Sequence, residues 1–259
     1  MIDKQNKINK ITLVFLLSVL MSSAVMAGIY APAAGQAGST AIHKDDSLLV
    51  AWADGYENYL VGSNCAASWQ TPQKALGKAV GDSYDIVCLG RGGQITMTFS
   101  TPITDGSGWD FAVFENSFND TFLELGYVEV SSDGTNFFGF FNDSQTTSSV
   151  GGFGAVDPTN ITGYCSKYRQ GYGTPFDLAD LAGTSSLLDV NRITHVRIID
   201  IVGDGTCLDS SGDVIYDPYP TSGSAGVDLD AIGVIHQIPE PVTLALLSLG
   251  LVPALRRRK

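Results

Sequence analysis

The sequence predicts an all-β protein: a single jelly-roll-type β-sandwich in residues 28–237, between two apolar terminal segments at 1–27 and 238–259. Three observations predict this fold class. Short segments alternate apolar and polar residues, glycine-rich turns separate them, and no long segment has helical periodicity. Many short strands joined by such turns are typical of a sandwich or a jelly roll.

The first strands are expected from alternation and from short apolar runs. Alternation puts apolar side chains on one face at 95–99 and again at 127–131, and the run at 111–114 is typical of a buried strand. Asp133 and Gly134 then form a tight hairpin turn, in which glycine tolerates a positive φ. The next strand carries the phenylalanines of 137–141.

Two further strands are expected late in the chain, at 195–199 and 229–234. Short helices are expected at 71–76, with Pro72 near the start, and at 176–182, closed by Gly183. The connections at 143–175 and 203–227 are long and polar, and in such a domain long loops are more often functional than the sheets.

The amino-terminal segment has the order of a secretory signal peptide. Three lysines within residues 4–10 precede an apolar stretch from Ile11 to Ala27, which ends in Val25-Met26-Ala27. Small residues at the −3 and −1 positions predict cleavage after Ala27. A retained membrane anchor is the alternative.

The carboxyl-terminal segment has three parts in order. They are Pro239-Glu240-Pro241, the 14 uncharged residues 242–255, and the basic cluster Arg256, Arg257, Arg258 and Lys259. Fourteen helical residues reach only about 21 Å, short of the roughly 30 Å of a bilayer core, so we expect transient membrane contact with the basic end on the cytoplasmic side. The layout resembles the PEP-CTERM sorting signal of Gram-negative bacteria, which an exosortase-type enzyme reads. A plain membrane tail is the alternative.

The charge of the central region excludes one class of partner. Between residues 28 and 238 there are eight basic and 25 acidic side chains, a formal charge of −17. Such a surface repels phosphate backbones, so nucleic-acid binding is not expected. It suits divalent cations and neutral or basic polymers, although extracellular solubility alone accounts for most of the charge.

The even number of cysteines in an exported chain predicts disulfides. From their order along the chain we expect Cys65 to pair with Cys88 and Cys165 with Cys207. Three pairings are possible, and the sequence does not choose among them. The spacings are wide and lack CxxC, which disfavours zinc or thioredoxin-type chemistry.

Calcium is the metal that the acidic segments favour, because it takes 6–8 oxygen ligands and aspartate-rich loops with glycine bends supply them. The spacing is not that of an EF-hand, and a solvated polar loop with Asx turns is the alternative. Glu115 and Asn116, at the end of an expected strand, are either further metal ligands or turn formers. The candidate ligands are Asp204, Asp209, Asp213 and Asp217 in one loop, and Asp228 and Asp230 on one face of a strand.

A sugar-binding face needs flat aromatic rings with polar neighbours. Tyr164, Tyr168 and Tyr172 lie in a glycine-rich loop and are the candidate ligand contacts, although aromatic packing under the loop is the alternative. Arg91 is either a donor to the ligand or the partner of a core carboxylate. An enzyme is not expected, because neither G-x-S-x-G nor H-E-x-x-H occurs.

Three segments resemble the galactose-binding-like jelly rolls of discoidin and carbohydrate-binding domains. They are the hairpin at 128–137, the strand at 194–198 and the closing strand at 228–234. A larger set of segments resembles a family of bacterial cell-surface proteins, many with the same sorting signal. This set comprises 30–35, 75–77, 89–93, 110–116 and 228–231. Cys165 and Cys207 stand where small residues are expected in that family. The resemblance implies a secreted β-sandwich and no established activity.

These observations lead to one expectation of function. We expect a non-catalytic exported protein of the cell surface or extracellular matrix that binds extracellular polysaccharide, with a structural calcium. A purely structural surface or biofilm component without a discrete ligand is the alternative, and a glycan-active enzyme is the third possibility.

Overall fold

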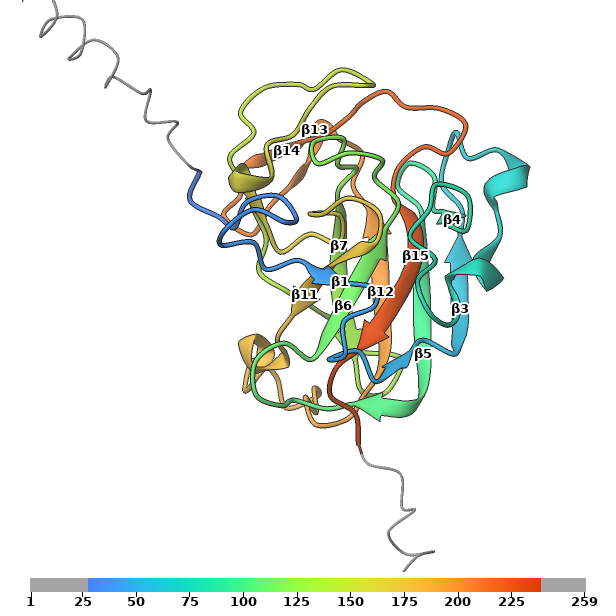
Figure 1. The fold of residues 1–259 in the computed structure, drawn as a ribbon, viewed down its shortest axis with the longest axis vertical. Helices are drawn as coiled ribbons and strands as arrows, with labels where there is room; N and C mark the ends of the chain where they lie inside the picture. The colour runs from blue at the N-terminus through green and yellow to red at the C-terminus, as the bar shows by residue number, and fades with distance from the viewer. Residues whose placement is uncertain (1–27, 239–259) are drawn as a thin grey trace, which may run out of the picture.

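The computed structural model describes residues 28–238, and its fold is all-β (Figure 1). The predicted signal peptide and nearly all of the predicted sorting segment therefore lie outside the described residues. Within 28–238, no helix is both long and apolar enough to cross a membrane.

Two antiparallel sheets form the body of the molecule. The first has the order β1-β11-β6-β15-β2, with β4 also paired to β15, and the second has the order β3-β5-β12-β7-β8. The strands of the first sheet are β1 Ile42–His43, β2 Ala51–Trp52, β4 Val87–Cys88, β6 Phe111–Glu115, β11 Tyr172–Phe176 and β15 Asp228–Val234. Those of the second are β3 Gly55–Leu60, β5 Gln94–Ile103, β7 Gly126–Ser131, β8 Phe138–Gly139 and β12 Ile193–Asp200.

The loops carry short elements of their own. Two-stranded ribbons pair β9 with β10 and β13 with β14. The bounds of these strands are β9 Asp143–Ser144, β10 Ile161–Thr162, β13 Asp204–Leu208 and β14 Val214–Tyr216. Four 3-10 turns complete the chain: η1 Ala67–Trp69, η2 Pro72–Ala75, η3 Pro158–Asn160 and η4 Leu178–Leu181.

The two sheets share one core. Phe111 and Val113 of β6 belong to the same buried cluster as Met97 of β5 and Val196 of β12. Alternation produces this arrangement, because successive side chains of a strand point to opposite faces and the apolar set of each sheet turns inward. Burying these side chains supplies the main driving force for folding, about 25 cal/mol for each Å² of apolar surface removed from water.

The predicted strands are confirmed with small changes of boundary. The segments at 95–99, 111–114, 127–131, 195–199 and 229–234 lie in β5, β6, β7, β12 and β15. Gly134 has the positive φ, 73°, that the hairpin turn requires. Beyond that turn only Phe138–Gly139 pair as a strand, so the strand through 137–141 is shorter than predicted. The two predicted helices are single 3-10 turns, and the side chain of Asp177 caps the second by accepting from the amide of Ala179.

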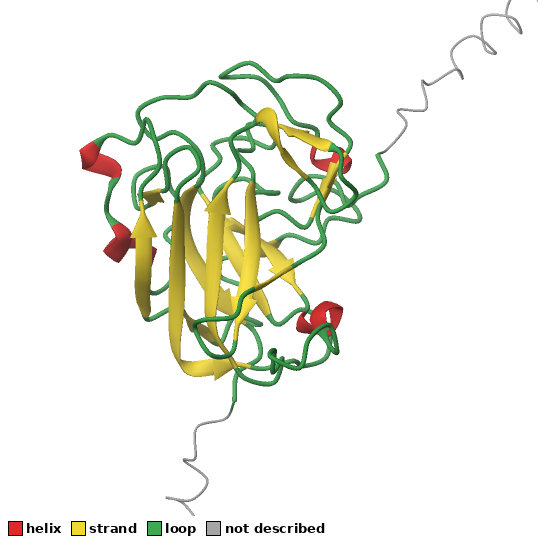
Figure 2. Cartoon of the chain, turned by 180° about the vertical axis from the view of Figure 1, so that it is seen from behind, coloured by secondary structure: helices red, strands yellow, loops and turns green. Residues whose placement is uncertain are grey.

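Long loops gather at one end of the sandwich, at the top of Figure 1. Viewed from behind, the strands lie in layers beneath the same loops, and the η4 turn lies near the opposite end (Figure 2). β15 runs between the two ends, from Asp228 beneath the loops to Val234, and its seven residues span about 20 Å. Two groups of acidic side chains lie at these opposite ends.

The four cysteines are free thiols in the structure, which corrects the expectation of two disulfides. Cys165 lies in the sandwich core, whereas Cys207 packs on a separate cluster with Tyr127. Cys65 is nearer its expected partner, with its Sγ 3.6 Å from the carbonyl oxygen of Cys88. Order along the chain does not report the distance between side chains, and this is why the expectation failed.

Candidate functional site

A cleft with aromatic walls and an acidic floor lies at the loop end of the sandwich. Its volume is about 210 Å³, far more than the space that one water molecule or ion requires. We call it the aromatic cleft. Its lining residues are Trp69, Ser83, Tyr84, Asn116, Phe118, Phe122, Glu124, Phe153, Thr221, Ser222, Ser224 and Asp228.

The walls consist of two aromatic stacks. Trp69 and Tyr84 stack with ring centroids 6.4 Å apart and planes 18° apart. The second stack has Phe122 at its centre, with Phe118 at 4.7 Å and Phe153 at 6.1 Å. Tyr84 is 70% exposed and Phe153 is 90% exposed, which is unusual for large rings unless they meet a ligand or a partner.

Asx turns hold the rings in place. Asn119 accepts hydrogen bonds at Oδ1 from the amides of Thr121 and Phe122, at 2.8 and 2.7 Å. Asp82 does the same for the amide of Tyr84, at 2.8 Å. Short polar side chains favour such turns because they replace backbone partners locally. The aromatic side chains therefore project from well-defined loops.

Two carboxylates form the floor of the cleft. Asp228 is the first residue of β15 and is only 3% exposed, and its Oδ1 has no hydrogen-bond donor. Glu124 accepts at Oε1 from the hydroxyl of Thr221, at 2.7 Å, and from the amide of Gly226, at 2.9 Å. Within 28–238 the structure shows no hydrogen bond to the other oxygen of Glu124.

Burial controls the ionisation of these acids. It raises the pKa of Glu124 to about 8, and the charges of Asp228 and Asp200 act in the same direction. Burial also raises the pKa of Asp228 to about 7, although polar groups of Ser224, Cys88 and Asn116 oppose it. Behind the floor, burial and the charge of Asp228 raise the pKa of Glu115. Titratable groups with shifted pKa values in a cleft are typical of functional sites.

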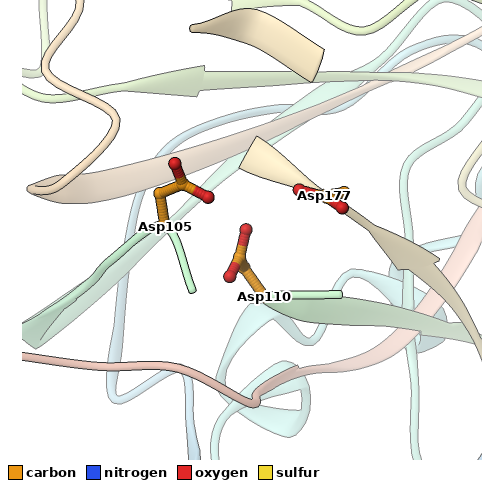
Figure 3. Close-up of side chains that lie close together, drawn as sticks. All are labelled: Asp105, Asp110 and Asp177. Carbon is orange, nitrogen blue, oxygen red and sulfur yellow. The ribbon is translucent and has the colours of Figure 1, made fainter. Parts of the chain in front are cut away.

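A second acidic group lies at the opposite end of the sandwich, where Figure 3 shows three carboxylates facing one another. One ligand oxygen from each of Asp105, Asp110 and Asp177 lies within 4.8 Å of the others, and no other such group of three was found in residues 28–238. Asp105 follows β5, Asp110 directly precedes β6 and Asp177 is the N-cap of η4. We call them the aspartate triad.

Hydrogen bonds position Asp110 at the centre of the triad. Its Oδ1 accepts from the amide of Gly106 and faces Nδ1 of His236, both at 2.8 Å, and its Oδ2 accepts from the amide of Leu178 at 2.7 Å. Oδ1 of Asp105 is buried without a donor. Burial first, and then the charges of Asp110 and Asp177, raise the pKa of Asp105. Three carboxylates with one unpaired oxygen fit a hard cation such as calcium.

The predicted calcium loop is instead a hairpin of β13 and β14. Asp209 uses both oxygens on backbone amides, those of Ser211 and Asp213 at 2.9 Å and that of Ser144 at 3.0 Å. Asp204 caps its own turn at Thr206, and Asp213 is exposed. These are the Asx turns of the alternative interpretation.

The remaining predicted metal ligands are also separated. Asp217 is buried and accepts from the amide of Leu125 at 2.7 Å. Asp230 accepts from the amides of Val80 and Gly81, at 3.0 and 2.8 Å. Of the six predicted ligands only Asp228 reaches the aromatic cleft, and none belongs to the aspartate triad.

The predicted tyrosine face is not a surface. Tyr164 is fully buried and Tyr168 is 1% exposed, so neither ring can stack on a sugar in solution. Tyr172 is partly buried beneath the guanidinium of Arg169, which lies 4.7 Å from its ring centroid. The alternative interpretation, aromatic packing under the loop, is therefore the correct one for Tyr164 and Tyr168.

Arg91 stands behind the cleft rather than in it. Its Nη2 donates to the carbonyl of Thr221, and its guanidinium lies 4.9 Å from the ring centroid of Tyr219. Its charge lowers the pKa of the buried Asp200, although burial keeps that pKa raised, at about 7. Arg91 thus supports the loop that forms one side of the cleft.

Sequence reasoning missed most of the cleft, although a signal was present. Phe118 and Phe122 stand in the polar segment 116–122, where large apolar side chains have no strand pattern to bury them. The structure makes them a wall of the cleft. The sequence left Glu115 and Asn116 as either metal ligands or turn formers. In the structure Glu115 is buried and accepts from the amide of Ser117 at 2.8 Å. Asn116 lines the cleft.

Comparison with known proteins does not assign this chain to a family. No protein-family model matches the chain, and no curated protein matches it.

Proposed function

We propose that this chain is a non-catalytic, exported protein of the cell surface or extracellular matrix that binds extracellular polysaccharide in the aromatic cleft. The observation that carries the proposal is the pair of aromatic stacks, each with at least one exposed ring, above polar floor groups. Ligand sites combine apolar walls with a few well-placed polar groups, and the flat carbon face of a sugar ring matches an aromatic ring.

The finer assignment of the fold belongs to the same proposal. Two facing antiparallel sheets with loops gathered at one end support a jelly-roll-type sandwich. Ligand binding at the loop end agrees with the placement of the cleft. Export, exosortase-type sorting and transient membrane contact rest on the terminal sequences and are likewise proposals.

A structural calcium is part of the proposal, and the aspartate triad is the place that supports it best. Calcium there would neutralise three facing carboxylates and tie the ends of β5, β6 and β11 together. A ligand that binds only the folded state raises the melting temperature. We expect calcium to raise it relative to chelator, and Asp105→Asn to abolish the difference. Equal melting temperatures in the two buffers would exclude a calcium site.

The experiment for the main function is a binding measurement. Purified full-length chain is titrated with extracellular polysaccharide of the producing cell, and Trp69→Ala is compared with the native sequence. Saturable binding that Trp69→Ala weakens supports the proposal. No binding would favour the alternative, a purely structural surface or biofilm component.

A glycan-active enzyme is the third possibility, because Glu124 and Asp228 place two carboxylates with raised pKa values in one cleft. Such pairs perform general acid and nucleophile or base chemistry in glycoside hydrolysis. Release of reducing ends that Glu124→Gln abolishes, with the fold intact, would replace the binding function by this one.

A further inference from the structure

The floor of the aromatic cleft is acidic and has no basic partner. Among the cleft's lining residues there is no lysine, arginine or histidine. The nearest basic groups are engaged elsewhere. Lys74 donates to the carbonyl of Tyr84 at 2.5 Å and lies 3.9 Å from Asp85, and Arg91 donates to Thr221 behind the cleft.

Asp228 shows most directly that a partner is missing. The residue is nine-tenths buried and lines the cleft, and no donor reaches its Oδ1 with hydrogen-bond geometry, although polar groups of Ser224, Cys88 and Asn116 lie close enough to lower its pKa. A buried polar atom without a hydrogen bond is costly, and a buried unpaired charge is more so. A cation or a strong donor in the cleft would satisfy this atom.

Other buried acids near Asp228 increase the need for a cation or a hydrogen-bond donor in the cleft. Glu124 lines the same floor, and Glu115 pairs with Leu229 across the sheet, next to Asp228. Glu115 and Asp200 are both buried and satisfied by backbone amides, those of Ser117 for the first and of Gly92 and Val227 for the second. Four carboxylates therefore face this region, and the charge of Arg91 lowers the pKa of one of them, Asp200.

The walls decide which kind of cation fits. Aromatic ring faces attract ammonium groups, and the stacks of Trp69 with Tyr84 and of Phe118 with Phe122 flank the floor. A bare metal ion gains little from such walls and needs several oxygen ligands. The cleft does not contain three His, Cys, Asp or Glu side chains whose ligand atoms lie within 4.8 Å of one another. An organic cation with a flat carbon face matches both the walls and the floor.

We propose that the polysaccharide bound in the aromatic cleft carries free amino groups, and that the ammonium group of a hexosamine ring pairs with Asp228 and Glu124. This inference rests on the proposed function and names its substrate class. The ring stacks on the aromatic walls while its ammonium donates to Oδ1 of Asp228. The acidic surface of the whole domain favours the same basic polymer.

Ionisation provides a second readout. The pKa values of Asp228 and Glu124, about 7 and about 8, leave the floor partly protonated at neutral pH. An ammonium beside these acids lowers their pKa values. Binding of an amine that is already protonated therefore releases protons from the floor, and titration at pH 6 in two buffers of different ionisation enthalpy measures this release.

The test compares two oligosaccharides that differ only in acetylation. Full-length chain is titrated calorimetrically with a β-1,4 glucosamine hexamer, an N-acetylglucosamine hexamer and a glucose hexamer. We expect the glucosamine hexamer to bind at least tenfold more tightly than the acetylated one. Asp228→Asn and Glu124→Gln each remove that preference, whereas Asp189→Asn, an exposed carboxylate at the other end of the sandwich, retains it.

The outcomes separate this inference from the proposed function. Equal affinity for the glucosamine and acetylated hexamers, or preference for the glucose hexamer, would overturn the amino-sugar inference and leave polysaccharide binding in place. A lysine hexamer that binds as tightly as the glucosamine hexamer would overturn it in favour of a basic peptide. No binding to any of these sugars or to the native polysaccharide would remove both. Circular dichroism of the variants confirms that a lost preference reflects the cleft and not unfolding.

Discussion

The backbone amide of Asn116 donates to the carbonyl oxygen of Asp228 over 3.2 Å and joins the end of β6 to the start of β15. This hydrogen bond fixes two polar side chains at the floor of the aromatic cleft from segments more than a hundred residues apart. The strands beneath are fully buried, whereas the rings of Tyr84, Phe118 and Phe153 above them are exposed. Such a site combines a fixed polar floor with accessible walls.

Removing one aromatic wall will weaken polysaccharide binding. Trp69→Ala deletes the ring that stacks on Tyr84, and we expect at least a tenfold loss of affinity, about 1.4 kcal/mol. The matched control is Trp109→Ala. That side chain is 40% exposed and lines a separate hollow with Lys167 and Phe141, so its loss leaves the affinity unchanged. Equal losses in the two variants would show that the cleft is not the binding site.

Stability will depend on pH through Glu124. An acid whose pKa is raised by folding keeps its proton in the folded state while the unfolded chain loses it. The free energy of unfolding therefore falls as pH rises from about 4.3, the unfolded value, to about 8. Each such group contributes a slope of about 1.4 kcal/mol per pH unit.

Glu124→Gln removes one of these groups and keeps the acceptor for Thr221 and Gly226. Urea unfolding between pH 5 and 7.5 will therefore show a shallower decline than in the native sequence. Asp189→Asn, on an exposed loop, should leave the slope unchanged. A slope identical in the native and Glu124→Gln chains would show that Glu124 is ionised in the folded state.

Gly226 is required by two constraints at the floor of the cleft. Its φ is +73°, and a Cβ there would lie 2.2 Å from Oδ1 of Asp200. Gly212 has a φ of +88° with no atom near its Cβ position, so it carries the conformational constraint alone. We expect Gly212→Ala to cost about 1 kcal/mol and Gly226→Ala clearly more, measured by urea unfolding. Similar costs would mean that the Asp200 side chain moves aside freely.

Asp110 stabilises the end of the sandwich opposite the cleft. Its carboxylate meets the amides of Gly106 and Leu178 and the ring of His236, so Asp110→Ala leaves the buried Leu178 amide without an acceptor and removes the partner of the other two groups. We expect a loss of about 3 kcal/mol in chelator, where calcium cannot contribute. Asp213→Ala, at an exposed side chain, should stay within about 0.5 kcal/mol. A small effect at Asp110 would show that its partners find other acceptors.

Thiol reactivity will follow burial. Cys88 and Cys165 are buried, whereas Cys65 and Cys207 are partly exposed. We expect two thiols to react with Ellman's reagent in the folded protein and all four after unfolding. If the thiols of the folded protein reacted only after reduction, the disulfides predicted from the sequence would be present after all.

The sequence alone determined the β-class of the fold and most of its strands. Alternation at 95–99 and 127–131 is a local signal, because the two-residue period of a strand fixes which side chains face the core. The Asx turns of the acidic loop were likewise foreseen as an alternative, since Oδ1 of Asp209 accepts from the amides of Ser211 and Asp213, only a few residues away.

Only the tertiary structure decided where the site lies. Phe118 and Phe153 come from different loops, and Asp228 reaches the same cleft from a third segment, so no local spacing relates them. The same holds for the aspartate triad, whose members are joined by the packing of β5, β6 and η4. Burial also reversed the role of Tyr164, because an aromatic residue in a polar loop can face solvent or pack beneath the loop. Sequence period reports local geometry, whereas the meeting of distant side chains depends on how the sheets and loops pack.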